Sequence, residues 1–256
     1  MSDSDLGSNT NAIALNQARI DLAAAHRLAV LHDLDEAIDN HFTMTVPGTD
    51  DQFLGLPYGL HWTEASASNL ILFDAEGQTL SGQGLAELSA VCIHEPIHRL
   101  CDAPVVLHTH QPWTLALNML DNNRLVTASQ NAAYFHGRVA YDDTYAGTAD
   151  YPAEGERLAP LITGPIHTVF LKNHGALVVG NTVGQAYRRL YMLERVCRAQ
   201  LLAMGSGQPL APLGEPVIAA VLAPAPHDSH SRPEREGLFF AAMKRLLDRE
   251  MPGYAD

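Results

Sequence analysis

The sequence is poor in cysteine and in basic residues and has no long apolar run, and each shortage excludes a class of protein. Only three of the 256 residues are cysteines, Cys92, Cys101 and Cys197, without the spacing of a metal finger. No apolar stretch approaches the roughly 20 residues of a membrane helix. Residues 1–10 are polar and do not read as a secretory leader. We therefore expect reduced thiols and a cytoplasmic protein.

The charge balance limits the partners. Lysine and arginine total 16 against 29 acidic residues, which gives a formal net charge of −13. Such a chain is a poor ligand for nucleic acid or for an anionic membrane. Apolar residues make up 46% and charged residues 18%, as in ordinary globular proteins. The expected partner is therefore a small-molecule substrate.

Hydrophobic periodicity predicts a layered α/β fold. Apolar residues at helical spacing predict helices over 15–33, 85–100, 113–120, 125–134, 154–161, 182–204 and 234–249. Shorter apolar or alternating runs predict strands over 40–46, 52–56, 69–73, 103–110, 138–141, 169–171 and 176–179. Residues 1–12 are expected to be disordered and residues 13–256 to form one domain. Because the strands cluster centrally with helices around them, we predict a single layered α/β domain.

Two histidines end the predicted strand 103–110. Residues i and i+2 of a strand point to the same face, so His108 and His110 project together. The residues before them are apolar. Burying two imidazoles there without partners would cost a few kcal/mol, and a metal ion is one such partner.

A third histidine is placed by a turn between two apolar runs. In Asn173-His174-Gly175 we expect Gly175 to supply a positive φ. Together with the strand pair, His174 completes a three-histidine metal constellation with open positions, which suits catalysis better than structural bracing. His227 and His230, near the last predicted helix, are expected in a surface loop.

The predicted helix before the strand adds further candidates. In a helix over 85–98, Glu87, Ala90 and His94 share one face, with His98 one turn further. His94 and His98 are therefore candidate metal ligands, acid/base groups or donors to the ligands. Glu87 and Glu95 are candidate acid/base groups.

Several stretches together resemble the class II aldolase/adducin family over about residues 12–252. They are Asn40-His41-Phe42-Thr43, Leu56-Pro57-Tyr58-Gly59-Leu60, Ile93-His94, Val106-Leu107-His108-Thr109-His110, Gly137-Arg138-Val139-Ala140-Tyr141, Leu171-Lys172-Asn173-His174-Gly175 and Leu246-Leu247-Asp248-Arg249-Glu250. The order of His-Thr-His and Asn-His-Gly is fairly specific. The resemblance is greatest to the adducin-like bacterial branch, in which His94 is typical.

The resemblance implies a three-layer α/β/α domain with a central, mainly antiparallel sheet, assembled as a homotetramer. It implies that His108, His110 and His174 bind a divalent metal, usually zinc, with Fe(II), Mn or Co as alternatives. It also places Tyr134 in the region of a catalytic tyrosine that related aldolases supply from a neighbouring subunit, although core packing is the alternative for this residue.

This sequence departs from the sugar-phosphate aldolases at two places. Their acid/base glutamate corresponds to Ala90, and their phosphate-binding Ser-Gly or Thr-Gly pair corresponds to Tyr58-Gly59. The metal ligands are thus retained, whereas the base and the phosphate site are lost. Glu87, one helical turn from Ala90, is the first candidate to replace the base.

Three functions follow as hypotheses. The leading one is a metal-dependent lyase that cleaves a carbon–carbon bond, by decarboxylation or retro-aldol cleavage, in an unphosphorylated keto, hydroxy or aromatic carboxylate substrate. The second is an Fe(II)-dependent oxygenase of secondary metabolism, because three histidines hold iron as readily as zinc. The third is a non-catalytic, adducin-like assembly protein, which predicts the loss of metal ligands.

Overall fold

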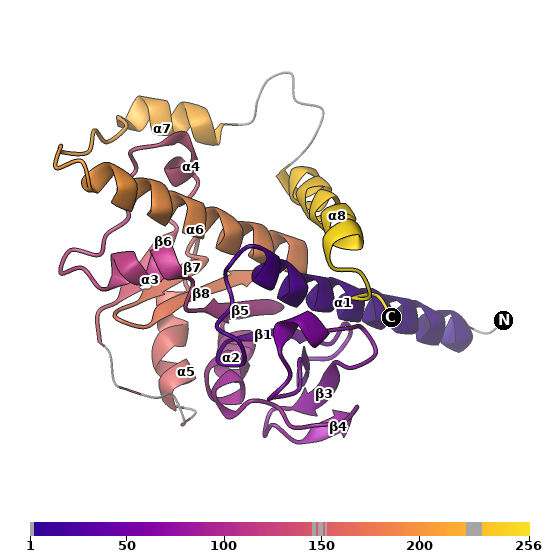
Figure 1. Cartoon of the computed structure of the whole chain (residues 1–256). Helices are drawn as coiled ribbons and strands as arrows, with labels where there is room; N and C mark the ends of the chain where they lie inside the picture. The colour runs from indigo at the N-terminus through magenta and orange to yellow at the C-terminus, as the bar shows by residue number, and fades with distance from the viewer. Residues whose placement is uncertain (1–2, 145–146, 148–150, 152, 224–231) are drawn as a thin grey trace.

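The computed structural model describes residues 3–144, 147, 151, 153–223 and 232–256, and in this part of the chain the strands form one eight-stranded sheet (Figure 1). The strand order is β4-β3-β2-β1-β5-β8-β7-β6. All neighbours are antiparallel except β6 and β7, which are parallel. The bounds are β1 His41–Thr45, β2 Gln52–Gly55, β3 Ile71–Asp74, β4 Thr79–Ser81, β5 Val105–Thr109, β6 Val139–Asp142, β7 Thr168–Leu171 and β8 Gly175–Gly180.

Helices cover both faces of the sheet, which gives the predicted three layers. Helices α1, α6 and α8 lie on one face, and α2 and α5 lie on the other (Figure 1). The helix bounds are α1 Asp3–Leu31, α2 Leu88–Cys101, α3 Pro112–Asn118, α4 Gln130–Ala133, α5 Ala153–Leu158, α6 Val183–Met204, α7 Glu215–Leu222 and α8 Arg232–Glu250, with short 3₁₀ turns η1 Trp62–Glu64 and η2 Ala159–Leu161.

The side-chain alternation of the central strands explains this arrangement. In β5, Val105 and Leu107 belong to the core shared with α1 and α6, whereas Val106 belongs to a second core with Ile93 and Ile97 of α2. All five residues of β5 are buried. A strand covered on both faces reads as a continuous apolar run, which is the pattern in the sequence. His108 follows the Val106 face and therefore points toward α2.

Several expected elements differ from the structure. Helix α1 begins at Asp3, whereas disorder was expected over 1–12; residues 1–2 lie outside the described part. The helix expected over 125–134 is only α4, because the Ser129 side chain caps it by accepting a bond from the backbone N–H of Ala132. Strand β4, η1 and helix α7 were not predicted. Pro216 in the first turn of α7 is compatible with a helix, since no donor is needed there.

The remaining predicted elements agree with the structure to within a few residues at their ends. None of the helices in the described ranges combines the length and apolar character required to cross a membrane. His227 and His230 lie outside the described residues.

Candidate metal centre

The end of β5 brings His108 and His110 together, as strand alternation predicts. Their Nε2 atoms lie 3.0 Å apart. His108 is buried, and its Nδ1 lies 3.1 Å from the carbonyl oxygen of Ala176 on the neighbouring strand β8. Nδ1 of His110 is hydrogen-bonded to the Glu36 carboxylate. A carbonyl or carboxylate accepts a proton, so both rings carry hydrogen on Nδ1 and present the lone pair of Nε2 to each other.

The β7–β8 turn adds His174 to this pair. Its ring centroid lies 4.8 Å from that of His108 and 4.6 Å from that of His110. We expected Gly175 to take a positive φ, but Asn173 takes it, at 58°, because asparagine tolerates the left-handed region. Gly175 is required for a different reason: a Cβ there would lie 2.4 Å from the carbonyl oxygen of Thr109.

The three histidines fit a divalent cation. One nitrogen from each ring lies within 4.8 Å of the others. Two nitrogens held about 2.0–2.1 Å from one ion are roughly 2.9 Å apart at a right angle and roughly 3.4 Å apart at the tetrahedral angle. The observed 3.0 Å falls in this range. A cation between the two facing lone pairs would also remove their repulsion. We call His108, His110 and His174 the histidine cluster.

Burial favours the neutral, ligand-ready form of two of the cluster's imidazoles, His108 and His174. Burial, reinforced by the neighbouring histidines, holds the pKa of His108 well below its usual value. Burial also lowers the pKa of His174 to about 4, helped by His110 and opposed by the Glu154 and Glu36 carboxylates. A neutral imidazole offers a lone pair at neutral pH, which metal binding requires.

A buried hydrogen-bonded chain extends from the cluster toward α2. His41 pairs opposite His108 across β1 and β5, with ring centroids 4.9 Å apart. Its Nδ1 lies 2.9 Å from Nε2 of His94. The Thr43 hydroxyl lies 2.7 Å from Nδ1 of His94 and 2.7 Å from Nε2 of His98.

The direction of hydrogen-bond donation along this buried network follows from its end at His98 and Ala103. Nδ1 of His98 lies 2.5 Å from the carbonyl oxygen of Ala103, so it is the donor. Burial lowers the pKa of His98 to about 4, so its Nε2 accepts from the Thr43 hydroxyl. Thr43 then accepts from His94, and His94 accepts from His41. The network therefore assigns the hydrogen of His41 to Nδ1 and leaves its Nε2 as an acceptor.

This network changes the expected roles of His94 and His98. His98 does not join the histidine cluster; it stacks on the Phe53 ring at 5.0 Å and bonds the residues described above. His98 was a candidate metal ligand, but α2 directs its side chain toward Phe53 and Thr43 and away from the end of β5. His94 is also buried, and both of its ring nitrogens are engaged by His41 and Thr43. It therefore positions His41 and does not face an open site.

Glu87 lies in a small cavity next to His41, whose ring neighbours that of His108; the three cluster histidines are not among the described residues that line it. The cavity is lined by His41 and Glu87, and also by Tyr58, Gly59 and Ala90, the positions at which the sequence was expected to depart from the sugar-phosphate aldolases. The Glu87 carboxylate accepts a 2.5 Å hydrogen bond from Ser89. Burial raises the pKa of Glu87 to about 7; the Ser89 bond opposes this rise and the charge of Asp39 adds to it.

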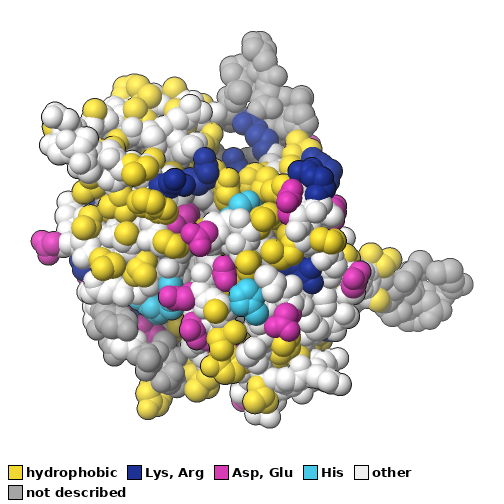
Figure 2. Space-filling model, in the orientation of Figure 1, with side chains coloured by type: hydrophobic (Ala, Val, Ile, Leu, Met, Phe, Trp, Pro, Cys, Tyr) yellow, Lys and Arg dark blue, Asp and Glu magenta, His cyan; other side chains and the backbone are white. Residues whose placement is uncertain are grey.

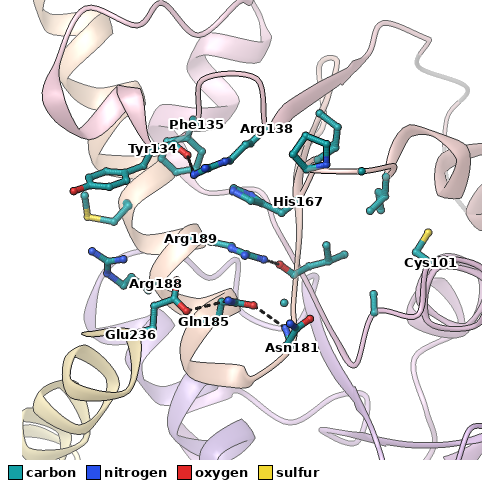
Figure 3. Close-up of a pocket in the computed structure, with 18 of the residues that line it drawn as sticks. Cys101, Tyr134, Phe135, Arg138, His167, Asn181, Gln185, Arg188, Arg189 and Glu236 are labelled. Carbon is teal, nitrogen blue, oxygen red and sulfur yellow. Dashed lines mark hydrogen bonds between the residues drawn. The ribbon is translucent and has the colours of Figure 1, made fainter. Parts of the chain in front are cut away.

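Two other candidate acid/base residues lie elsewhere. The Glu95 carboxylate is paired with the Arg99 side chain at 2.8 Å, one turn along α2. Tyr134 lines a different cavity, next to Arg138 and His167, at the other end of the sheet (Figure 3). Neither approaches the histidine cluster within this chain. A role for Tyr134 in a neighbouring subunit's site stays a prediction.

Sequence reasoning missed Glu36 and the central place of His41. Glu36 lies in the connection between α1 and β1 and fixes the ring of His110, which is how metal-ligating histidines are commonly oriented. Only the strand register places His41 opposite His108. The one available signal was the Asn40-His41-Phe42-Thr43 stretch, which was noted as a resemblance without a role.

Comparisons with known proteins agree with this geometry. The family model described as Class II Aldolase and Adducin N-terminal domain matches residues 20–201. A Caulobacter vibrioides protein, provisionally named as a class 2 aldolase, is 32% identical over 94% of this chain and 92% of its own length. Mammalian adducins match as well, but this chain spans no more than 33% of their length.

Solved structures give the same result. An aldolase II superfamily protein from Pseudomonas syringae superposes with a TM-score of 0.84 at 33% identity, covering 95% of this chain and 96% of that one. The L-fuculose 1-phosphate aldolase of Glaciozyma antarctica superposes with a TM-score of 0.78 at 26% identity, covering 92% of each chain.

Proposed function

This chain belongs to the class II aldolase and adducin family, and from that premise we propose that it is a divalent-metal-dependent lyase that cleaves a carbon–carbon bond of an unphosphorylated substrate. Membership implies lyase chemistry in general. The observation that carries the proposal is the intact histidine cluster. Next to it His41 lines a small cavity that Glu87 and Ala90 also line. The same intact cluster argues against a purely structural, adducin-like role.

The histidine cluster would hold the metal ion that serves as the electron sink. A divalent cation held there, zinc in the first instance, would act as a Lewis acid toward a carbonyl or phenol oxygen next to the scissile bond. The protein fixes the ligand geometry through the Ala176 carbonyl on His108 and the Glu36 carboxylate on His110. Such partners orient the rings and raise their basicity.

Glu87 is our proposed proton-transfer group. A carboxyl with a pKa of about 7 is present in both protonation states near neutral pH, which suits a group that takes a proton and returns it. His41 lines the same cavity, and its Nε2, the acceptor end of the buried chain, is suited to accept a hydrogen bond from a substrate hydroxyl.

The cavity supports an unphosphorylated substrate. The backbone N–H of Tyr58 is already bonded to the carbonyl of Leu85 at 2.9 Å, so it is not directed at a phosphate. No lysine or arginine is found among the described residues that line the cavity, whereas phosphate sites depend on such cations or on converging N–H groups. The missing cations argue against a phosphate but do not themselves select a carboxylate. The proposed substrate class stays a keto, hydroxy or aromatic carboxylate, whose oxygens a metal in the histidine cluster would bind in place of a cationic side chain. The homotetramer and the cytoplasmic location stay predictions.

The test is a metal and substrate survey of the purified protein. We expect one divalent ion per chain by elemental analysis, and release of CO₂ or an aldehyde from hydroxy, keto or phenolic carboxylates in preference to L-fuculose 1-phosphate. His110→Ala should lose both metal and turnover. His136→Asn, remote from the cluster, should retain both. Glu87→Gln should keep the metal and lose about 10²–10⁴-fold in kcat.

Two outcomes would overturn the proposal. Iron together with substrate-dependent O₂ uptake would favour an oxygenase. A higher kcat/KM on the phosphorylated sugar than on every unphosphorylated substrate would place phosphate recognition in a part of the site that we have not identified.

A further inference from the structure

His26 of helix α1 is a second histidine in the wall of the cavity that His41 and Glu87 line. Its side chain is only 1% exposed, and histidine occupies only small areas of the face drawn in Figure 2. The ring centroid lies 5.0 Å from that of Phe42 and 4.8 Å from that of Trp62, so strand β1 and turn η1 hold the ring in place. The lyase chemistry proposed above does not use this residue.

The two ring nitrogens of His26 differ in what they bind. Nδ1 lies 2.8 Å from the carbonyl oxygen of Leu22, one turn earlier in α1, and therefore donates a hydrogen bond to it. Burial lowers the pKa of His26 to about 4, and the bond to Leu22 opposes this effect. The ring is thus neutral at neutral pH, with its hydrogen on Nδ1 and a lone pair on Nε2.

Nε2 of His26 is open to the cavity. The ring makes one hydrogen bond, through Nδ1, to the part of the chain that the structure describes. In that same part, every fully buried side-chain nitrogen or oxygen has a partner. Nε2 has none, so it is not fully buried and contributes to the small exposed area of the ring. Because the ring lines the cavity, this acceptor is available to a group that enters it.

The indole N–H of Trp62 follows the same pattern. Trp62 is 2% exposed and also lines the cavity, and its Nε1 makes no hydrogen bond to the described residues. A hydroxyl group donates one hydrogen bond and accepts others. It can therefore donate to His26 and accept from Trp62, whereas a carbonyl oxygen has no hydrogen to offer to Nε2.

The size of the cavity selects one small group. Its volume is about 20 Å³, and a single water molecule needs about 10–15 Å³. The lining includes the apolar side chains of Ile38, Leu56 and Leu60. In such surroundings an acceptor without a donor costs free energy, which a hydrogen bond from the bound group restores.

We propose that His26 determines substrate specificity, because its Nε2 accepts a hydrogen bond from a hydroxyl group of the substrate bound in this cavity. The inference rests on the proposed function in one respect: the substrate extends from the histidine cluster past His41, whose ring centroid lies 4.9 Å from that of His108. A methyl group in place of the hydroxyl would leave Nε2 unpaired. Sites that bind a hydroxyl in this way reject such analogues strongly.

The test is calorimetric titration of the zinc-loaded protein with three pairs of carboxylates that differ by a hydroxyl in place of a methyl group. The pairs are 3-hydroxypyruvate and 2-oxobutanoate, 4-hydroxy-2-oxobutanoate and 2-oxopentanoate, and 4-hydroxybenzoate and 4-methylbenzoate. We expect the hydroxyl compound of at least one pair to bind at least tenfold more tightly than its methyl partner. Binding needs no turnover, so the lyase assignment can fail while this preference stands, and the preference can fail while lyase activity stands.

Matched variants assign the preference to His26. His26→Phe keeps an aromatic ring against Phe42 and Trp62 but removes the acceptor, so the two compounds of the preferred pair should bind within twofold of each other. His136→Phe makes the same substitution outside the cavity and should keep the wild-type ratio. Nitrogen NMR of the histidine rings gives a second measurement that needs no substitution. In the wild-type protein, the Nε2 resonance of His26 should move when the hydroxyl compound is added and stay in place with the methyl compound.

Three results would overturn the proposal. The first is equal binding within every pair, including no binding of any compound. The second is an unchanged hydroxyl preference in a folded His26→Phe protein, which would place the recognition elsewhere. The third is an Nε2 resonance that does not respond to the hydroxyl compound, which would leave water as the only partner of His26.

Discussion

At the scale of single residues, Thr43 links the two imidazoles of α2 in the buried hydrogen-bonded network. Its hydroxyl donates to His98 and accepts from His94, and so passes on the direction that the Ala103 carbonyl sets at His98. Reversal of this one hydroxyl would require a proton to move on each ring. The threonine between the two buried imidazoles therefore takes part in assigning the hydrogen of His41 to Nδ1.

We predict that Thr43→Val destabilises the fold by about 1–3 kcal/mol, because two buried imidazoles lose a partner while the shape of the side chain is kept. Urea unfolding measures the difference. The matched control is Thr45→Val on the same strand, whose hydroxyl lies 3.3 Å from a His98 nitrogen that is already bonded to Ala103. The control should cost less than the Thr43 substitution, and equal losses would contradict the assigned chain.

The raised pKa of Glu87 predicts how the stability of the protein depends on pH. The pKa of this carboxyl is raised from 4.5 to about 7 by burial, so between these values the folded state keeps a proton that the unfolded state releases. The folded state binds more protons, and stability therefore falls as pH rises from about 4.5 to 7. Below this window the carboxyl is protonated in both states and no penalty exists.

Glu87→Gln should remove this dependence. The stability of the variant relative to wild type should increase through the window and level off above pH 7, as measured by urea unfolding at a series of pH values. Glu76→Gln, at an exposed position on the turn after β3, is the control and should follow wild type. A constant difference between Glu87→Gln and wild type at all pH values would contradict the raised pKa.

At the scale of elements, the close approach of α5 to α2 depends on a glycine and a proline. Pro96 has no N–H to donate to the carbonyl of Cys92, four residues before it. Gly155 of α5 packs at this point, where a Cβ would lie 2.5 Å from the Cys92 carbonyl oxygen and 2.8 Å from Pro96. The absence of a side chain on α5 thus lets it lie against the irregular part of α2.

Gly155→Ala should destabilise the protein by about 1–3 kcal/mol, since the added methyl forces α5 away from α2. Thermal and urea unfolding measure the loss. Gly237→Ala in α8 is the matched control, because a Cβ there meets nothing within 4 Å and alanine is the better helix former, so it should stabilise by up to about 1 kcal/mol. If Gly155→Ala left the free energy of unfolding unchanged, α5 and α2 would be able to move apart without cost.

The helices and strands also show which parts of the fold could be predicted from the sequence. Helix α6 was predicted because its apolar periodicity is long, and β5 because it is a continuous apolar run. Alternation along the strand correctly put His108 and His110 on one side. Strand β4 has three residues, too few for a period. His98 and His94 were expected to share a helix face with Glu87, but α2 begins only at Leu88, with Glu87 as its extended N-cap residue. The two histidines bond to residues of β1 and not to the cluster.

At the scale of the whole molecule, the candidate metal centre depends on long-range pairing. Its ligands come from β5 and the β7–β8 turn, its orienting carboxylate from the connection after α1, and its buried support from β1 and α2. Periodicity cannot show which strands are neighbours, so Glu36 and His41 could be found only in the folded chain.

This assembly predicts strong linkage between metal and stability. Because the unfolded chain does not hold the three histidines together, Zn²⁺ at 100 times its Kd should add about 2.7 kcal/mol to the free energy of unfolding. For a chain of this size that corresponds to a Tm increase of roughly 5–11 °C. EDTA should reverse the increase, and His110→Ala should show none. The same increase in His110→Ala would place the zinc elsewhere.

The order of the strands in the sheet has a consequence for biosynthesis. Strand β5 is flanked by β1 and β8, which lie far from it on opposite sides in the sequence. While the ribosome is still making the middle of the chain, His108 and His110 have emerged but His174 has not, so the nascent protein offers only a two-histidine chelate. Closing such distant strand pairs is slow compared with forming helices. Capture of an ion by all three histidines must therefore follow the synthesis of the β7–β8 turn and the pairing of β8 with β5.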